Sequence, residues 1–76
     1  MNSNCIYVFK STYLTFRAER ALKSAGIACA LVTKPRHISS DCGLAVRIAT
    51  ERKADAGSIL EKQAIPCLGV WNLASA

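Results

Sequence analysis

Paired cysteines, histidines and glycine-rich loops are scarce or missing in this sequence of 76 residues, and each shortage argues against a class of site. There is one histidine, and the four cysteines, at positions 5, 29, 42 and 67, form no Cys-x-x-Cys pair. Zinc ligands usually come in pairs two to four residues apart, so this spacing argues against a zinc site. No glycine-rich phosphate loop is present either. We therefore expect no metal and no cofactor.

The chain also lacks the hydrophobic segments that direct a protein into or across a membrane. No apolar run approaches the ~18–20 residues of a membrane span. Residues 1–5 contain no basic segment that leads into an apolar one, as a signal peptide would. Because a reducing cytosol disfavours disulfides, the sequence predicts a cytoplasmic protein with free thiols and no membrane partner.

Acidic residues are half as frequent as basic ones: five Asp and Glu stand against ten Lys and Arg, for a net charge of +5. Such an excess can serve an RNA, a membrane surface or an anionic substrate. Here the basic residues are spread along the chain, without a dense block. We interpret most of them as solvated surface and keep RNA binding as the weakest of three functional hypotheses.

What the sequence does contain is an alternation of strand and helix signals. Hydrophobic residues make up 51% of the chain, enough for the core of one domain over residues 1–76. Short apolar runs rich in β-formers predict strands over 5–9, 27–33, 42–49 and 65–72.

Apolar residues at helical spacing predict two helices between these strands. Ser11 or Thr12 should cap the first helix and Gly26 should follow its end, while Thr50 should cap the second. Glu19 and Lys23 are spaced to pair on the first helix. The buried stripes should be Leu14, Ala18, Ala21, Leu22 and Ala25 in the first helix, and Ala54, Gly57, Leu60 and Ala64 in the second.

The element order βαββαβ predicts an α+β, ferredoxin-like domain. Two interleaved right-handed units give a four-stranded antiparallel sheet in the order 4-1-3-2, with both helices on one face. The end of the first strand, the start of the first helix and the start of the third strand then meet at one edge. Cys42 should lie there, close to Lys10 and Ser11.

Strand alternation assigns faces within this sheet. It places Cys42 with Val46 and Ile48 on the face that the helices should cover, and Arg47 on the other. The other face should also be apolar, because the residues on both sides of the first strand are apolar. An exposed apolar sheet face usually marks an interaction surface. We therefore predict a homodimer or higher oligomer through the open face, with Ala45, Trp71 and one of the pairs Ile6/Val8 and Tyr7/Phe9 exposed on it.

Side chains that could take part in chemistry are concentrated in residues 35–47. This stretch holds the only histidine, a proline, two serines and Cys42. Cys42 stands where polar turn residues give way to an apolar strand, so its thiol could reach solvent while the backbone holds it in place. The other cysteines, Cys5, Cys29 and Cys67, lie in apolar runs and are interpreted as packing residues. Cys42 is the candidate for chemistry.

A reactive thiol must be ionised, and a helix N-terminus or nearby cations lower its pKa. Ser39 and Ser40 could donate hydrogen bonds to an anionic sulfur, and Gly43 permits close backbone approach or a positive φ. Asp41 would act in the opposite direction unless it points into solvent. The cations expected near the thiol are Lys10, Lys34, Arg36 and His37.

The same stretch also has a purely structural interpretation. Ser, Asp and Gly are common turn residues, so residues 39–43 could simply connect two strands. Cys42 would then be the first core residue of the third strand, His37 an exposed loop residue, and Pro35 a strand stop. Composition alone favours this interpretation slightly.

The string Pro35-Arg36-His37-Ile38-Ser39-Ser40-Asp41-Cys42-Gly43, followed by Leu44-Ala45-Val46-Arg47, resembles the signature of a small bacterial family of selenium/sulfur carrier-like proteins. The likeness covers nearly the whole chain, from an opening strand that ends in phenylalanine before a Ser-Thr turn. The final strand departs from the pattern, because it reads Leu68-Gly69-Val70-Trp71 where a tyrosine is expected.

The resemblance implies that Cys42 accepts sulfur or selenium as a persulfide or selenosulfide, flanked by the matching residues Pro35, Arg36, Ser39 and Ser40. In this first hypothesis His37 and Gly43 also line the substrate, Lys10 and Ser11 support the site, and the partners are donor and acceptor proteins. The second hypothesis is a ferredoxin-like binding or regulatory module whose loop binds a small anion or a partner protein without a covalent step. In both, a carrier or binding role fits the sequence better than a true enzyme.

Overall fold

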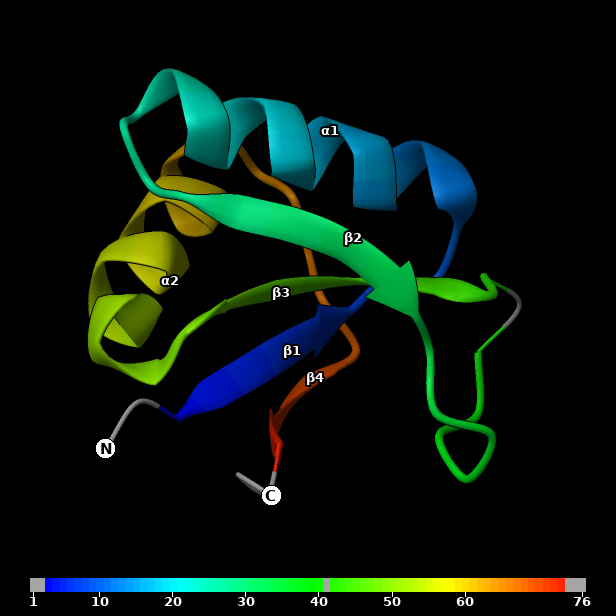
Figure 1. Cartoon of the computed structure of the whole chain (residues 1–76). Coiled ribbons are helices and arrows are strands. Elements are labelled where there is room, and N and C mark those ends of the chain that lie inside the picture. Colours follow the sequence, from blue (N-terminus) through cyan, green and yellow to red (C-terminus); the bar gives the residue numbers. More distant parts are fainter. Residues whose placement is uncertain (1–2, 41, 74–76) are drawn as a thin grey trace.

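Strand and helix alternate along the chain as the sequence predicts, with one additional short helix. The computed structural model describes residues 3–40 and 42–73. Its elements are β1 (Asn4–Val8), α1 (Thr12–Ser24), β2 (Cys29–Thr33), β3 (Leu44–Ala49), the 3-10 turn η1 (Thr50–Arg52), α2 (Lys53–Lys62) and β4 (Gly69–Leu73) (Figure 1).

The four strands form one antiparallel sheet in the order β2-β3-β1-β4, which is the predicted order read from the opposite edge. β1 lies in the middle, where Tyr7 is opposite Val46 of β3 and Val70 of β4. β2 pairs with β3, so that Thr33 faces Leu44. The prediction of an α+β domain with a four-stranded antiparallel sheet and two helices is confirmed.

Both helices end in the same backbone motif. α1 begins after Ser11, whose hydroxyl accepts the N–H of Leu14 at 3.2 Å, and Gly26 follows its end at φ +80°. The N–H of the next residue, Ile27, returns to the carbonyl of Leu22 at 2.9 Å, as in a Schellman motif. α2 ends likewise, but its left-handed residue is Ala64, at φ 55°. The predicted cap and C-terminal glycine of α1 are thus confirmed.

Two details of the helices differ from the expectation. The buried residues of α1 are Thr15, Ala18 and Leu22, so the inner face is rotated from the predicted stripe toward a polar residue. In α2 the buried residues are Ala56 and Leu60, whereas Ala54 and Ala64 are exposed. Thr50 starts the 3-10 turn and makes no side-chain cap, because α2 begins only at Lys53.

The helices cover one face of the sheet and enclose the main core. This cluster joins Phe9 and Ile48 of the sheet region to Leu22 of α1 and Leu60 of α2. α1 packs over β2 and β3 and against α2 (Figure 1). The predicted pairing of Glu19 with Lys23 is present, with 3.2 Å between the charged atoms.

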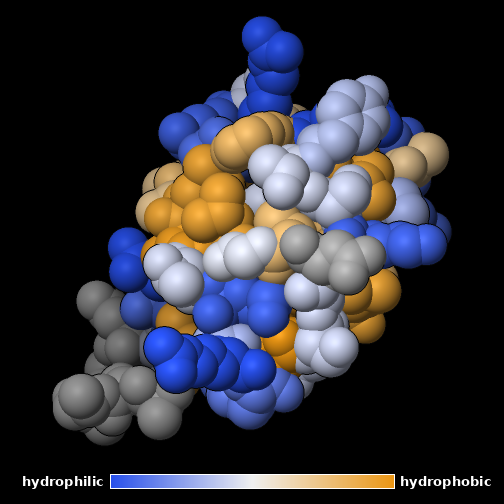
Figure 2. Space-filling view, turned by 90° about the vertical axis from the view of Figure 1, so that its right-hand side faces the viewer, coloured by the Kyte–Doolittle hydropathy of each residue, from blue (hydrophilic) through white to orange (hydrophobic). Residues whose placement is uncertain are grey.

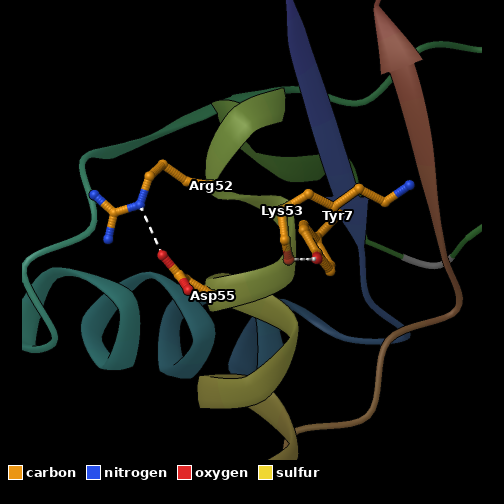
Figure 3. A network of polar contacts seen from close by, with 4 residues as sticks. All are labelled: Tyr7, Arg52, Lys53 and Asp55. Atoms are coloured by element: carbon orange, nitrogen blue, oxygen red, sulfur yellow. Dashed lines mark hydrogen bonds and ion pairs between the residues drawn. The ribbon is translucent and has the colours of Figure 1, made fainter.

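Figure 3 shows how the start of α2 is joined to the central strand. The Tyr7 hydroxyl donates to the carbonyl oxygen of Lys53 at 3.1 Å, and so ties the first turn of α2 to β1. Arg52 and Asp55 form an ion pair at 3.2 Å beside this bond. That pair is exposed, and such pairs contribute little to stability.

The second face of the sheet is covered by the chain itself. Ile6, Val8 and Ala45 have no exposed surface and form one buried cluster with Ile38 from the loop after β2. The cluster is completed by Val32, Trp71 and Leu73, which are partly buried. The expected open apolar face is therefore absent from residues 3–40 and 42–73, and the basis for predicting an oligomer through that face is lost.

Candidate functional site

The chain segments that were expected to meet at one edge of the sheet do so. The segment 9–11 after β1, the first turn of α1, the segment after β2 and the residues before β3 lie together at one end of the molecule (Figure 1). The N–H of Lys34 donates to the carbonyl of Gly43 at 2.9 Å, and the Ser40 hydroxyl donates to the carbonyl of Phe9 at 2.7 Å. The first bond joins the two ends of the loop between β2 and β3, and the second holds this loop against the residue that follows β1.

Cys42 lies inside this junction, below the first turn of α1. Its sulfur is 3.2 Å from Oγ1 of Thr15 and 3.6 Å from Oγ1 of Thr12, both on α1. The backbone N–H of Leu44 donates to the same sulfur at 3.4 Å. The thiol is therefore placed among three polar groups, one from the strand that follows it and two from the helix above it.

The thiol is buried, and this corrects one expectation. Cys42 is 1% exposed, and Thr15 beside it has no exposed surface. Figure 2 views the end of the molecule that carries the start of α1 and the loop after β2, where hydrophobic and hydrophilic side chains meet. Cys42 was expected on an exposed rim of the sheet. The sulfur instead lies against Thr12 and Thr15 of α1, and Ser40 holds the loop that carries Cys42 to the carbonyl of Phe9.

The polar surroundings nevertheless favour the thiolate. Burial raises the pKa of Cys42, but the hydrogen bonds from Thr15, Leu44 and Thr12 and the positive charge of Lys34 together outweigh it, so that the pKa lies below its usual value.

Among the other thiols, burial raises the pKa of Cys5 and of Cys29. Cys67 is exposed, which contradicts its interpretation as a packing residue. Cys42 is thus the buried thiol whose hydrogen bonds outweigh burial and lower its pKa.

Ser40 connects the loop to the site. Besides its bond to Phe9, its hydroxyl accepts the N–H of Cys42 at 3.1 Å. Further along the loop, the Lys34 ammonium donates to the carbonyl of Ile38, and the N–H of Ile38 donates to the carbonyl of Pro35 at 3.1 Å. The loop is therefore a closed turn, anchored by Ile38 on the sheet and by Ser40 beside the thiol.

The structure brings together only part of the predicted site. Ser40 bonds to the backbone of Cys42, and Lys34 acts on its thiol by charge, whereas Arg36, His37, Ser39 and Lys10 are exposed. Ser11 caps α1 and reaches the thiol only through Thr15, which donates to its carbonyl. Asp41, and with it the expected effect of its charge, lies outside the described residues.

Gly43 does not play the part expected of it. It has no positive φ, and a Cβ built on it would meet nothing within 4 Å. Neither close backbone approach nor left-handed geometry therefore requires a glycine at this position. Its contribution is its carbonyl, which accepts the N–H of Lys34.

Thr15 was missed in the sequence, and Thr12 was considered only as a helix cap. A signal for Thr15 was present, because residues 15, 18 and 22 follow the spacing of one helix face. A polar residue at a core position of a short helix is unusual and indicates that a polar group faces it from the sheet.

The described residues contain neither a metal centre nor a membrane-spanning helix. No group of three or more His, Cys, Asp or Glu among residues 3–40 and 42–73 could hold a metal ion. Within the same residues, no helix has both the length and the apolar composition to cross a membrane.

Comparison with known proteins gives one match. Searches of curated proteins and of solved structures find no similar protein. A protein-family model described as "Putative Se/S carrier protein-like" matches residues 4–72, which include every helix and nearly all of every strand, together with the loop that carries Cys42. The chain therefore belongs to the Se/S carrier protein-like family.

Proposed function

We propose that this protein carries sulfur or selenium on Cys42, which accepts the atom from a donor protein and passes it to an acceptor protein. The observation that carries the proposal is the set of three hydrogen-bond donors, from Thr12, Thr15 and Leu44, around a buried thiol. Hydrogen bonds to an anion in a site shielded from water are strong, so this set stabilises the nucleophilic thiolate. Family membership supports the choice of cargo.

The proposed step is an exchange at a persulfide. The Cys42 thiolate attacks the terminal sulfur of a donor persulfide, R–S–SH, and a new bond forms between Cys42 and that sulfur. The sulfur–sulfur bond of the donor breaks, and its electron pair leaves with the donor cysteine as a thiolate. A donor that carries R–S–SeH would leave selenium on Cys42 in the same way. No external oxidant or reductant is needed.

Because Cys42 is 1% exposed, exchange with another protein requires the site to open, and we assign this movement to the loop between β2 and β3, which carries Ser40 and Cys42. Ser40 bonds this loop to Phe9 on one side and to Cys42 on the other, and so sets the closed position. The scaffold of the proposed carrier is ferredoxin-like, a proposal supported by the element order and by the strand order β2-β3-β1-β4. We place its action in the cytoplasm, where its thiols would stay reduced.

The loading reaction tests the proposal. Incubation with a cysteine desulfurase and L-cysteine, followed by intact-protein mass measurement, should add the mass of one sulfur to the wild-type protein. Cys42→Ser should abolish the addition. Cys67→Ser is the matched control, because it removes the exposed thiol and leaves Cys42 in place. Loading that survives Cys42→Ser, or that disappears with Cys67→Ser, would contradict the proposal.

One observation favours a second function. A thiol that is 1% exposed can serve only to position the loop, and the protein would then be a binding or regulatory module without a covalent step. The exposed Arg36 and His37 would contact a small anion or a partner protein in that case. This alternative predicts that Cys42→Ser retains function in cells, whereas Arg36→Gln loses it.

A further inference from the structure

Among residues 3–40 and 42–73, Thr15 holds the one side-chain hydroxyl that contacts both the Ser11 carbonyl and the buried thiol without reaching solvent. Its Oγ1 lies 2.9 Å from the carbonyl oxygen of Ser11 and 3.2 Å from the sulfur of Cys42. Thr15 has no exposed surface, so no bulk water competes for either contact. A hydroxyl has one proton to donate, and here two acceptors lie within reach of it.

We propose that Thr15 is a positioning residue that turns its single proton from Ser11 to Cys42 when Cys42 ionises. The inference deepens the proposed carrier function, because it names the residue that prepares the thiol for sulfur exchange. It does not need a sulfur donor for its test, so the two proposals can fail independently.

In the thiol state, the hydrogen bonds form a chain in which each donor has an acceptor. The S–H of Cys42 donates to Oγ1 of Thr15, and the hydroxyl of Thr15 donates to the carbonyl of Ser11. That is the ordinary hydrogen bond of a helical threonine to the carbonyl four residues before it.

In the thiolate state, the sulfur has lost its proton and becomes an acceptor only. The Thr15 hydroxyl turns toward it and joins the donors from Thr12 and from the Leu44 backbone. The carbonyl of Ser11 is not left empty, because it also accepts the backbone N–H of Thr15 at 3.1 Å. Both protonation states are therefore fully hydrogen-bonded, and no backbone movement is needed to pass between them.

The other groups around the sulfur cannot make this change. The Leu44 N–H can only donate, so it favours the thiolate at all times. Lys34, from the segment after β2, is the described charged residue that acts on the thiol, and it does so by charge. Thr12 is exposed, so water can take its place. The switch in hydrogen bonding is thus assigned to Thr15 alone.

The test is the ionisation of Cys42, followed through its ¹³Cβ chemical shift as the pH is raised. Thr15→Val keeps the shape of the side chain and removes the hydroxyl. The titration midpoint should move to higher pH, and at a pH below both midpoints the thiolate fraction should fall about five- to tenfold. Thr15→Ser, which restores the hydroxyl, should bring the thiolate fraction to within about twofold of wild type.

A residue with a merely structural role would not give this pattern, since valine fills the same space as threonine. An unchanged midpoint in folded Thr15→Val, or an equal displacement in Thr15→Ser, would overturn the proposal. If Thr15→Val does not fold, the wild-type protein suffices. The carbonyl ¹³C of Ser11 should then titrate with the Cys42 midpoint, because that oxygen loses one of its two donors, and a flat profile would also overturn the proposal.

Discussion

Removal of the Ser40 hydroxyl should let the loop between β2 and β3 open and speed the reaction of the Cys42 thiol with an added electrophile. The hydroxyl donates to the Phe9 carbonyl at 2.7 Å and accepts the Cys42 N–H at 3.1 Å. Ser40→Ala deletes both bonds and introduces no larger group. The two backbone partners then favour an open loop, in which water can satisfy them.

The size of the effect follows from these two bonds. A typical hydrogen bond contributes about 0.5–1.5 kcal/mol net, so their loss favours the open loop by about 1–3 kcal/mol. At about 1.4 kcal/mol for each tenfold change, the open population rises about 5- to 150-fold. The thiol is 1% exposed when closed, so alkylation proceeds from the open loop. Its rate should rise by the same factor while reclosing remains faster than alkylation.

The assay is the rate of iodoacetamide alkylation at Cys42, resolved from the other thiols by peptide mass. Ser39→Ala is the matched control, because Ser39 is the neighbouring residue, is exposed, and takes part in neither bond. Urea unfolding of each variant separates local opening from a loss of global stability. The reasoning is refuted if Ser40→Ala and Ser39→Ala alkylate at the same rate.

Three further predictions concern stability. The folded-state pKa of Cys42 is lowered, so its contribution to stability is present above the unfolded-state pKa and is lost as the pH falls through the folded-state value. The stability difference between wild type and Cys42→Ala in urea should therefore grow as the pH is raised toward the ordinary thiol pKa of about 8.5, and a constant difference would contradict the hydrogen-bonded thiolate. Ala64 has φ 55°, a left-handed conformation that glycine adopts without strain. Ala64→Gly should therefore raise the unfolding free energy by about 0.5–1 kcal/mol. A loss of stability would count against this account of the end of α2. A Cβ at Gly69 would lie 2.8 Å from the Trp71 ring, whereas one at Gly43 would meet nothing within 4 Å. Gly69→Ala should therefore lower the unfolding free energy by about 1–3 kcal/mol and change the tryptophan fluorescence. Gly43→Ala is the control and should change the unfolding free energy by less than about 0.5 kcal/mol.

Local signals in the sequence predicted those features of the fold that depend on residues close together in the chain. The cap at Ser11, the glycine after α1 and the Glu19–Lys23 pair depend on neighbours within a few residues, and all three are present. The strand order followed from chain connectivity and handedness, and it too agrees with the structure. The position of Cys42 near the start of α1 was a consequence of that order.

What the sequence did not predict depends on contacts between distant residues. Ile38 lies between the strands predicted at 27–33 and 42–49, yet it joins Ile6 and Val8 in a buried cluster on the face that was expected to be open. The burial of Cys42 also depends on distant residues, because Thr12 and Thr15 of α1 contact its sulfur and Ser40 ties the loop to Phe9. Thr15 was left out of the helix stripe since polar residues are not expected in a core, yet its buried hydroxyl contacts both the carbonyl of Ser11 and the sulfur of Cys42.

Burial and ionisation of Cys42 are coupled, and they act against each other during exchange. The donors that lower the pKa of Cys42 act only while the loop is closed, because water replaces them once the sulfur is exposed. Each hydrogen bond that stabilises the closed thiolate therefore makes opening from the thiolate state less favourable by the same free energy. It follows that Thr15→Val should raise the alkylation rate more at high pH, where it removes a donor to the closed thiolate, than at low pH, where it removes only the weaker bond from the thiol S–H. A mutation that only loosens the loop, such as Ser40→Ala, should raise both rates together. The ratio of the alkylation rates at high and low pH thus distinguishes Thr15, which stabilises the thiolate, from Ser40, which keeps the loop closed.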